Sequence, residues 1–333
     1  MDKLVDEKYI NDLTRAVQEA LAKSETRKWT GYVNKVVGLL LEARLPGAMV
    51  GELCQVVTDQ GDVKPAEVVG FRGETSLLLL LVDGRGVHQG SKIMQSGRLI
   101  EVLLGEGLLG RIVDAFGRPL DGGEIKGSLI PKPLDAAPPE AYGRPRIDTV
   151  FATGVRVIDG LLTLGMGQRI GIFSGSGVGK STTLGMIARY GDADINVIAL
   201  VGERGREVQD FIEVSLGEEG LKKSVVIVAT SDQPAMLRVK GLLTATTIAE
   251  YFRDQGKNVL LMADSVTRLA MAARDVGLSV GEPPTMKGYT PSVFAMLPKV
   301  LERSGRSKAG SITAIDTVLV EGDDFNEPIA DAV

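Results

Sequence analysis

The sequence predicts an α/β protein, in which a mostly parallel sheet flanked by helices follows a small β-barrel. After Thr149, uninterrupted apolar runs alternate with helical segments, which is typical of parallel strands buried on both faces. Between Thr30 and about Leu104, short apolar runs are separated by Gly, Asp and Pro turns, as in a compact barrel or sandwich. A chain of 333 residues with 44% hydrophobic content is long enough for about two domains.

The amino-terminal segment, residues 1–26, is expected to form an amphipathic helix. Its apolar residues recur at helical spacing and fall on one stripe. Such a stripe packs either on the body of this chain or on a partner protein, and the pattern leaves both possibilities open. The stripe consists of Val5, Tyr9, Ile10, Leu13, Val17, Ala20 and Leu21.

Residues 27–104 are expected to form the small β-barrel, and residues 105–150 a connector. Six of the chain's 14 prolines lie between Pro119 and Pro145. Proline at that density, among glycine and charged residues, predicts a semi-rigid linker and not a packed element.

The remaining residues, 151–333, carry the strand and helix alternation of the α/β domain. Ligands of such parallel sheets bind at the carboxyl ends of the strands, so residues that follow a strand are candidates for the site. We expect strands at residues 168–174, 196–202, 224–230, 258–264 and 311–320, and helices at residues 180–190 and 244–256.

The stretch "FSGSGVGKST", residues 173–182, resembles a P-loop except that Ser174 replaces the first glycine of G-x-x-x-x-G-K-[ST]. A strand leads into it and a helix follows, so free backbone N–H groups and the positive end of the helix dipole face one point, which suits polyphosphate. Ser174 lies at the strand exit, where ordinary backbone angles suffice and glycine is not required. The predicted phosphate-binding residues are Gly175, Ser176, Gly177, Val178, Gly179, Lys180, Ser181 and Thr182, with Lys180 reaching the terminal phosphates and Ser181 ligating Mg²⁺.

Two further strand ends carry charged residues that suit phosphate chemistry. Asp264 ends the strand of "NVLLMADSVTR", where a carboxylate can hold Mg²⁺ directly or through water. Glu203 follows the strand of "NVIALVGERGREV" and can orient an attacking water, with Arg204 and Arg206 as nearby cations.

Composition excludes several other classes of site. Cys54 and His88 are the only cysteine and histidine, so neither a disulfide framework nor a Cys/His metal site can form, and we interpret Cys54 as a buried strand residue and His88 as a turn residue. The net charge of −5 makes nucleic acid a less favoured partner. The apolar runs are too short to span a bilayer and the amino terminus is too charged for a signal peptide, so the cytoplasm is the default compartment.

These motifs together resemble the ATPase family of rotary ATP synthases and type III export systems, which implies a RecA-like P-loop NTPase core. "LLGRIVDAFGRPLDG" is similar to the segment that joins barrel and ATPase domain in that family, and "TGVRVIDGLLTLGMGQRIGIFSGSGVGKST" is similar to its lead into the P-loop. "GERGREV" and "ARDVGLSVGEPPTMKGYTPSVFAMLPKVLERSG" resemble the export branch, and "KGYTPSVF" resembles the flagellar group within it. Asp316 departs from the aromatic residue of the flagellar pattern.

The resemblance implies a Mg²⁺-dependent ATPase that energises type III protein export, most like the flagellar one. Glu203 would be the catalytic carboxylate, Arg204 its neighbour, Lys180 and Ser181 the phosphate and Mg²⁺ ligands, and Asp264 the acid beside the metal. It also implies a cytoplasmic homo-hexamer, peripheral at the inner-membrane export apparatus and without a nucleic-acid partner. The implied partners are a stator-like regulator on the amino-terminal helix, a central coiled-coil stalk protein, the export gate, chaperones and secreted proteins.

In the family, a helical carboxyl-terminal domain follows the ATPase domain and supplies part of the adenine pocket and an arginine that reaches the phosphate of the neighbouring subunit. The sequence ends at Val333, before that domain, so we expect a truncated chain with weak nucleotide affinity and poor hydrolysis, because an arginine finger supplied in trans is worth about 10³ to 10⁵ in rate.

Three alternative functions stay open beside flagellar export. An injectisome secretion ATPase shares nearly all the motifs. A non-hydrolysing subunit of a rotary ATP synthase ring is disfavoured by Glu203, for which it would have no use. A Rho-type RNA translocase is disfavoured by the negative charge and by the 5% aromatic content, with no base-stacking run in the barrel.

Overall fold

The structure is a computed structural model that describes residues 14, 29–140, 142–175, 177–320, 322 and 324–333. The predicted amino-terminal helix, apart from Thr14, and Ser176 of the predicted phosphate loop lie outside the described residues. Contacts divide the chain into two compact units, of which the first ends at Arg98 and the second comprises Leu99–Val333 together with Leu81–Asp83.

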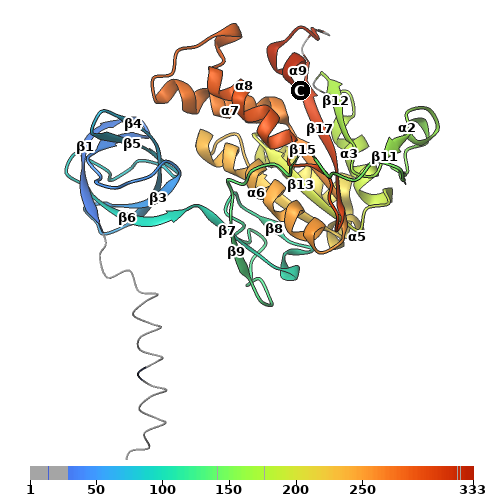
Figure 1. The fold of residues 1–333 in the computed structure, drawn as a ribbon, viewed down its shortest axis with the longest axis horizontal. Helices are drawn as coiled ribbons and strands as arrows, with labels where there is room; N and C mark the ends of the chain where they lie inside the picture. The colour runs from blue at the N-terminus through green and yellow to red at the C-terminus, as the bar shows by residue number, and fades with distance from the viewer. Residues whose placement is uncertain (1–13, 15–28, 141, 176, 321, 323) are drawn as a thin grey trace, which may run out of the picture. The chain divides into compact units, whose positions relative to one another are not determined.

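The first unit is a closed antiparallel barrel of six strands in the order β1-β2-β5-β4-β3-β6 (Figure 1). Side chains alternate between core and solvent along β1 and β3, as expected for strands with one buried face. Cys54 points into this core, where burial raises the pKa of its thiol to about 12, and His88 lies in an exposed turn. The strands are β1 (Thr30–Val37), β2 (Leu40–Ala43), β3 (Glu52–Val57), β4 (Val63–Arg72), β5 (Thr75–Leu80) and β6 (Lys92–Leu99).

The second unit is built on a sheet in the order β12-β17-β15-β13-β14-β8, in which every neighbouring pair is parallel. The central strands are buried on both faces, which explains their uninterrupted apolar sequences. Together with the barrel, this sheet confirms the predicted fold class. The strands are β8 (Ile112–Val113), β12 (Arg169–Ser174), β13 (Ile195–Val201), β14 (Ser224–Ala229), β15 (Asn258–Asp264), β16 (Gly305–Arg306, antiparallel to β17) and β17 (Ser311–Leu319).

Helices cover both faces of this sheet. On one face, α3 packs with the segment Phe211–Leu216 and with α5, and its residues Leu184, Ile187 and Ala188 join the apolar core over β13, β14 and β15. On the other face, α6 lies over β13, β14 and β15, and α7 lies beside α6 (Figure 1). The helices are α2 (Arg156–Leu161), α3 (Lys180–Tyr190), α4 (Gly205–Asp210), α5 (Gly217–Lys222), α6 (Ala235–Asp254), α7 (Val266–Ser279), α8 (Pro291–Leu301) and α9 (Pro328–Ala332), with short 3₁₀ turns at Glu106–Leu108 and Met286–Gly288.

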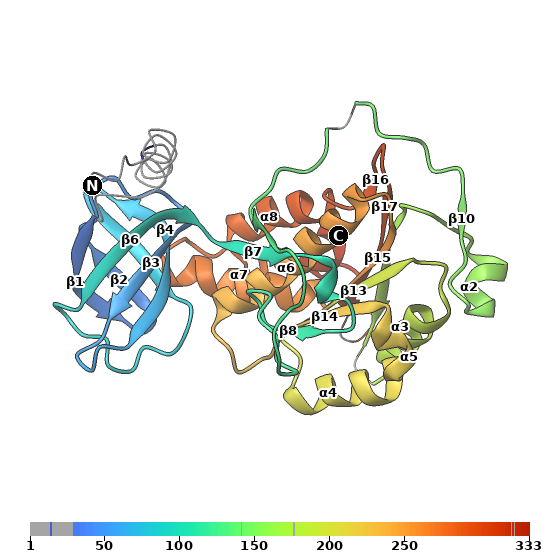
Figure 2. The same cartoon turned by 90° about the horizontal axis from the view of Figure 1, so that it is seen from below.

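The segment that we predicted as an unpacked connector, residues 105–150, contributes to the second unit. Figure 2 shows β8 at the edge of the sheet, beside β14. Further along, β9 (Ile130–Pro133) pairs with β7 (Glu101–Leu104), so β7 belongs to the second unit although we placed it in the barrel domain. Pro131 and Pro133 occupy alternate positions of β9, an edge strand, where a missing N–H is tolerated. These two prolines therefore lie in a paired edge strand and not in a free linker.

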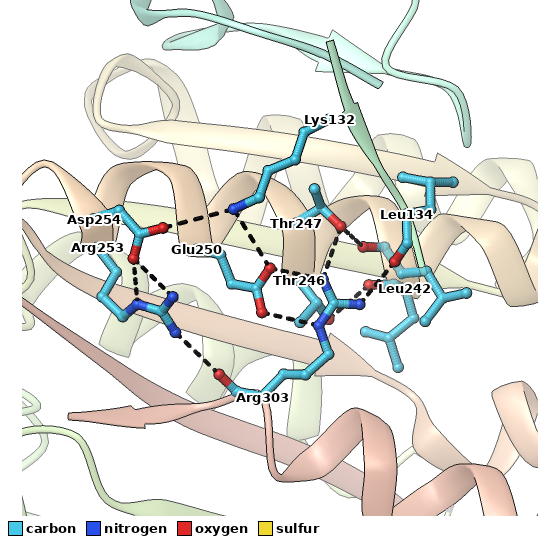
Figure 3. Close-up of polar contacts among 10 residues, drawn as sticks. Lys132, Leu134, Leu242, Thr246, Thr247, Glu250, Arg253, Asp254 and Arg303 are labelled. Carbon is cyan, nitrogen blue, oxygen red and sulfur yellow. Dashed lines mark hydrogen bonds and ion pairs between the residues drawn. The ribbon is translucent and has the colours of Figure 1, made fainter. Parts of the chain in front are cut away.

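A buried cluster of charges ties this segment to α6 (Figure 3). The guanidinium of Arg303 donates to both carboxylate oxygens of Glu250, at 2.9 and 2.7 Å, and to the carbonyl oxygen of Leu134 at 2.9 Å. Arg303 is only 2% exposed, so its charge depends on these partners.

A second two-stranded sheet of this unit, besides β7 with β9, is formed by β10 (Val150–Phe151) and β11 (Leu164–Gly165). These two strands lie before and after α2 in the chain.

Candidate active site

The phosphate loop connects the carboxyl end of β12 to the first turn of α3. Gly177 and Gly179 have φ angles of 79° and 94°, the left-handed region that residues with a side chain avoid. Gly179 is the N-cap of α3, and no side chain of a described residue caps this helix, so N–H groups of its first turn are available to a ligand. Ser174 is an extended strand residue, paired with Leu319 of β17, and its position does not need glycine.

The Lys180 ammonium group forms an ion pair with the Asp264 carboxylate. Both side chains are largely buried, with 12% and 4% of their surface exposed. The sheet register explains the contact, because β12 and β15 both pair with β17 and end at the same edge of the sheet. The Thr317 hydroxyl donates to the same oxygen of Asp264, Oδ1, at 2.9 Å. This buried ion pair holds the Lys180 side chain beside the loop.

Glu203 lies just beyond the end of β13, and its side chain is 11% exposed. Its Oε1 is 3.0 Å from Nε of Arg268, while Nη1 of Arg268 donates to the Gly202 carbonyl oxygen at 2.7 Å. Gly202 has a φ of 71°, and a Cβ there would come within 3.0 Å of the Arg268 side chain. The turn after β13 therefore places the Gly202 carbonyl oxygen and the Glu203 carboxylate against the same side chain, that of Arg268.

The acid–base state of Glu203 is set by its surroundings. Burial, a hydrogen bond shared with Glu207 and the nearby charge of Asp264 raise the pKa of Glu203 to about 7, against the opposing effect of Arg268. The same hydrogen bond lowers the pKa of Glu207, so the proton of the pair resides on Glu203. A carboxyl group that titrates near neutrality can accept a proton under ordinary conditions.

These residues line one cavity of about 350 Å³. Glycines of the loop and Lys180, Ser181 and Thr182 line one side. Glu203 and Asp264 come from the ends of β13 and β15, and Arg268 comes from the first turn of α7. Arg204 lies at the rim, since 74% of its side chain is exposed and its nearest acid is Glu207, at 3.8 Å. The structure thus brings together the predicted Lys180, Ser181, Glu203 and Asp264, with Arg204 mostly exposed at the rim of the same cavity.

Arg268 is a site residue that we did not predict. The signal was present, because Arg268 follows Asp264 by four residues and falls in the first turn of α7, which begins at the carboxyl end of β15. Arg206, which we expected as a second cation near Glu203, lies in α4, and no ion pair joins it to the site among the described residues.

A divalent cation would find few protein ligands here. Among the described residues, no group of three or more His, Cys, Asp and Glu side chains could hold a metal ion. Two hydroxyls, of Ser181 and Thr182, and three carboxylates, of Glu203, Glu207 and Asp264, line the cavity. Of these residues, Ser181 follows Lys180 directly and Asp264 forms an ion pair with it. That donor set fits Mg²⁺, which commonly binds through one or two protein oxygens together with substrate phosphates.

Comparison with known proteins identifies the family. The model of the ATP synthase alpha/beta family, nucleotide-binding domain, matches residues 154–333. The flagellum-specific ATP synthase of Bacillus subtilis is 54% identical over 322 residues, which are 96% of this chain and 74% of the relative. The chain belongs to the type III and flagellar export ATPases of the ATP synthase alpha/beta family.

Injectisome members of this export ATPase family are nearly as similar. The SPI-2 type 3 secretion system ATPase of Salmonella typhimurium is 51% identical, and the match covers 92% of this chain and 70% of the relative. The assembled ATPase EscN of enteropathogenic E. coli superimposes with a TM-score of 0.85 at 50% identity, covering 91% of this chain and 73% of EscN. The family is therefore an ATPase family with a nucleotide-binding domain, and this chain carries that domain. Within the described part of this export ATPase, no helix is long and apolar enough to cross a membrane.

Proposed function

We propose that this chain binds ATP with Mg²⁺ and hydrolyses it to energise type III protein export, with flagellar export as the first assignment. The convergence of Lys180, Asp264 and Glu203 on one cavity at the carboxyl ends of three strands carries the proposal. The resemblance to flagellum-specific ATP synthases of Bacillus subtilis and Treponema pallidum, each 54% identical, supports the flagellar assignment.

Phosphate binding rests on the loop and Lys180. The N–H groups of residues 177–182 surround the phosphates, and Lys180 exchanges its contact with Asp264 for the negatively charged terminal phosphates. Bound Mg²⁺, held by Ser181 and Asp264, supplies positive charge against the phosphate oxygens. We assign Ser181 and Asp264 as its ligands because, of the hydroxyls and carboxylates that line the cavity, Ser181 follows Lys180 directly and Asp264 is the carboxylate in ion-pair contact with Lys180.

Hydrolysis requires Glu203 in its ionised form. The carboxylate orients a water molecule and accepts its proton as the water attacks the terminal phosphate. Arg268 holds this carboxylate at 3.0 Å, and its positive charge favours the ionised form. Glu207 takes part by sharing the proton of Glu203, so it tunes the pH at which the base is available. Arg204, mostly exposed at the rim, has a secondary role as a neighbouring cation.

We further propose a ring of identical subunits around a central stalk. The relative EscN has been described in assembled form and in complex with its central stalk EscO, and this chain matches the latter structure with a TM-score of 0.83 at 48% identity. We also propose that the protein lies in the cytoplasm at the export apparatus and that residues 1–26 bind a stator-like regulator. Its further partners would be the export gate, chaperones and secreted proteins.

Injectisome secretion is the second candidate function. Its supporting observation is the 51% identity to the Salmonella typhimurium ATPase, only slightly below the flagellar value. Because the nucleotide site serves either pathway, the choice between them rests on which export apparatus a deletion of the gene disables. Loss of motility with intact effector secretion supports flagellar export, and the opposite pattern supports the second candidate.

The phosphate site is tested with Lys180→Ala, using Lys222→Ala as the matched control. Lys222 is an exposed lysine paired with Glu219, away from the cavity. We expect Lys180→Ala to weaken the binding of a fluorescent ATP analogue about 100-fold or more and Lys222→Ala to bind as the wild type, since a buried charge contact to phosphate is lost only in the first variant. Equal binding by both variants would contradict the assignment.

A further inference from the structure

Thr317 is a buried hydroxyl residue that touches the site without lining it. It is fully buried in β17, and its Oγ1 lies 2.9 Å from Oδ1 of Asp264 and 3.1 Å from the carbonyl oxygen of Ala263. A hydroxyl has a single hydrogen to donate. The carboxylate is both closer and charged, so it is the stronger acceptor of the two.

Packing alone does not explain a threonine here. Ile315, on the same face of β17, belongs to the apolar core beneath α3. A hydroxyl in such a layer is unfavourable unless it is hydrogen-bonded, whereas valine would fill the same volume. Thr313, also on this face, uses its hydroxyl differently, since it accepts from the backbone N–H of Gly167 at 2.8 Å. Thr313 thus serves the fold, and Thr317 is directed at a side chain of the nucleotide site.

Two donors meet at a single oxygen of Asp264. The Lys180 ammonium group and the Thr317 hydroxyl both contact Oδ1, and no hydrogen bond from a described residue reaches Oδ2. This arrangement fixes the rotation of the carboxylate and keeps Oδ2 open. When Lys180 turns to the phosphates, as the proposed function requires, Thr317 becomes the remaining donor to Oδ1 among the described residues.

We propose that Thr317 is a positioning residue that holds the Asp264 carboxylate in its Mg²⁺-binding orientation once nucleotide has drawn Lys180 away. The inference rests on the proposed function, because it assumes that Asp264 faces the metal. It assigns to Thr317 no contact with ATP or with the reacting atoms. Its effect is therefore confined to binding in the presence of the metal.

The test compares nucleotide affinity with and without Mg²⁺ in the full chain. The dissociation constant of a fluorescent ATP analogue is measured in excess Mg²⁺ and in EDTA, and the ratio of the two constants reports the contribution of the metal. Thr317→Val removes the hydroxyl at constant volume, Thr317→Ser keeps it, and Thr313→Val removes a hydroxyl from the same strand face. We expect Thr317→Val to reduce the ratio about tenfold, which is the effect of one hydrogen bond to a charged group, with unchanged affinity in EDTA.

The controls separate this role from a structural one. We expect Thr317→Ser and Thr313→Val to keep the wild-type ratio, even if Thr313→Val lowers the melting temperature. A wild-type ratio in Thr317→Val overturns the inference, and so does an equal loss of affinity with and without Mg²⁺, which would indicate a packing defect. If Thr317→Val does not fold, Thr317→Cys, a weaker donor of similar size, is expected to reduce the ratio, and an unchanged ratio overturns the inference in the same way.

Failure of the proposed function gives a different result. If the wild-type chain binds the analogue equally well with and without Mg²⁺, then Asp264 does not act through the metal. That result contradicts the proposed function and the inference together. A wild-type chain that needs Mg²⁺, together with a Thr317→Val variant of the same ratio, contradicts the inference and leaves the proposed function intact.

Discussion

Asp316 makes the stability of the second unit depend on pH. This carboxyl group is 6% exposed in β17, between Gly171 of β12 and Ala263 of β15. It lies at a cavity of about 310 Å³ that Arg169 and Glu302 also line. Burial raises the pKa of Asp316 from 3.8 to about 7, and the charge of Arg169, which is tied to Glu302 at 2.7 Å, only partly opposes this effect.

The sign and the size of the effect follow from the two pKa values. Because the folded chain holds this proton more tightly than the unfolded chain, the free energy of unfolding falls as the pH rises from 3.8 to about 7 and is constant above that. Each pKa unit is worth about 1.4 kcal/mol, so the whole effect is about 4 kcal/mol. About 3 kcal/mol of it falls between about pH 5 and about pH 8.

Asp316→Asn removes the ionisation and keeps the size of the side chain. We expect the free energy of unfolding of the wild type to decrease by about 3 kcal/mol more than that of the variant between about pH 5 and about pH 8. Urea denaturation followed by far-UV circular dichroism measures both, and the difference between the two proteins cancels the contribution of Glu203. Asp331→Asn, at an exposed residue of α9, is the control for loss of one negative charge. Identical pH slopes in Asp316→Asn and wild type would refute the reasoning.

Two further predictions concern the other charge pairs. Glu207→Gln should move the acidic limb of the pH profile of kcat/KM from about 7 to lower pH, because the hydrogen bond with Glu207 raises the pKa of Glu203. An acidic limb at the wild-type pH would show that a group other than Glu203 determines its position. Arg303→Met should lower the free energy of unfolding by about 3–5 kcal/mol, since it leaves the buried Glu250 without its main partner, and adding Glu250→Leu should recover most of that loss. A double variant no more stable than Arg303→Met would contradict the second prediction in the same urea assay.

The strands of the second unit and the nucleotide-binding loop could be predicted because their signals are local. Apolar runs such as residues 195–201 and 258–264 need burial on both faces, and only a parallel sheet under two helical layers provides it. The placement of Lys180, Glu203 and Asp264 follows, since residues that end parallel strands meet at one edge of the sheet. Ser174 was interpreted correctly as a strand residue for the same reason.

Features that depend on contacts distant in sequence could not be predicted. The packing of residues 105–150 is decided by β8 joining β14 and by Arg303 reaching Leu134, neither of which a local pattern reveals. The position of Arg268 just after β15 could be read from the sequence, but its contact with Glu203 could not, because that contact joins the starts of two helices that follow different strands. Arg204, adjacent to Glu203 in sequence, is the N-cap residue of α4 and lies mostly exposed at the rim of the cavity, beside Glu207.

Activation of water by Glu203, in a nucleotide site built on Lys180 and Asp264, is tested by Glu203→Gln. The substitution keeps the size and the hydrogen-bonding capacity of the side chain but removes the base. ATP binding and the release of phosphate after a single turnover are measured on the same preparation of the variant and the wild type. We predict an ATP affinity within about threefold of wild type and a rate of phosphate release at least about 100-fold lower. Phosphate release at the wild-type rate, with ATP bound normally, would contradict it.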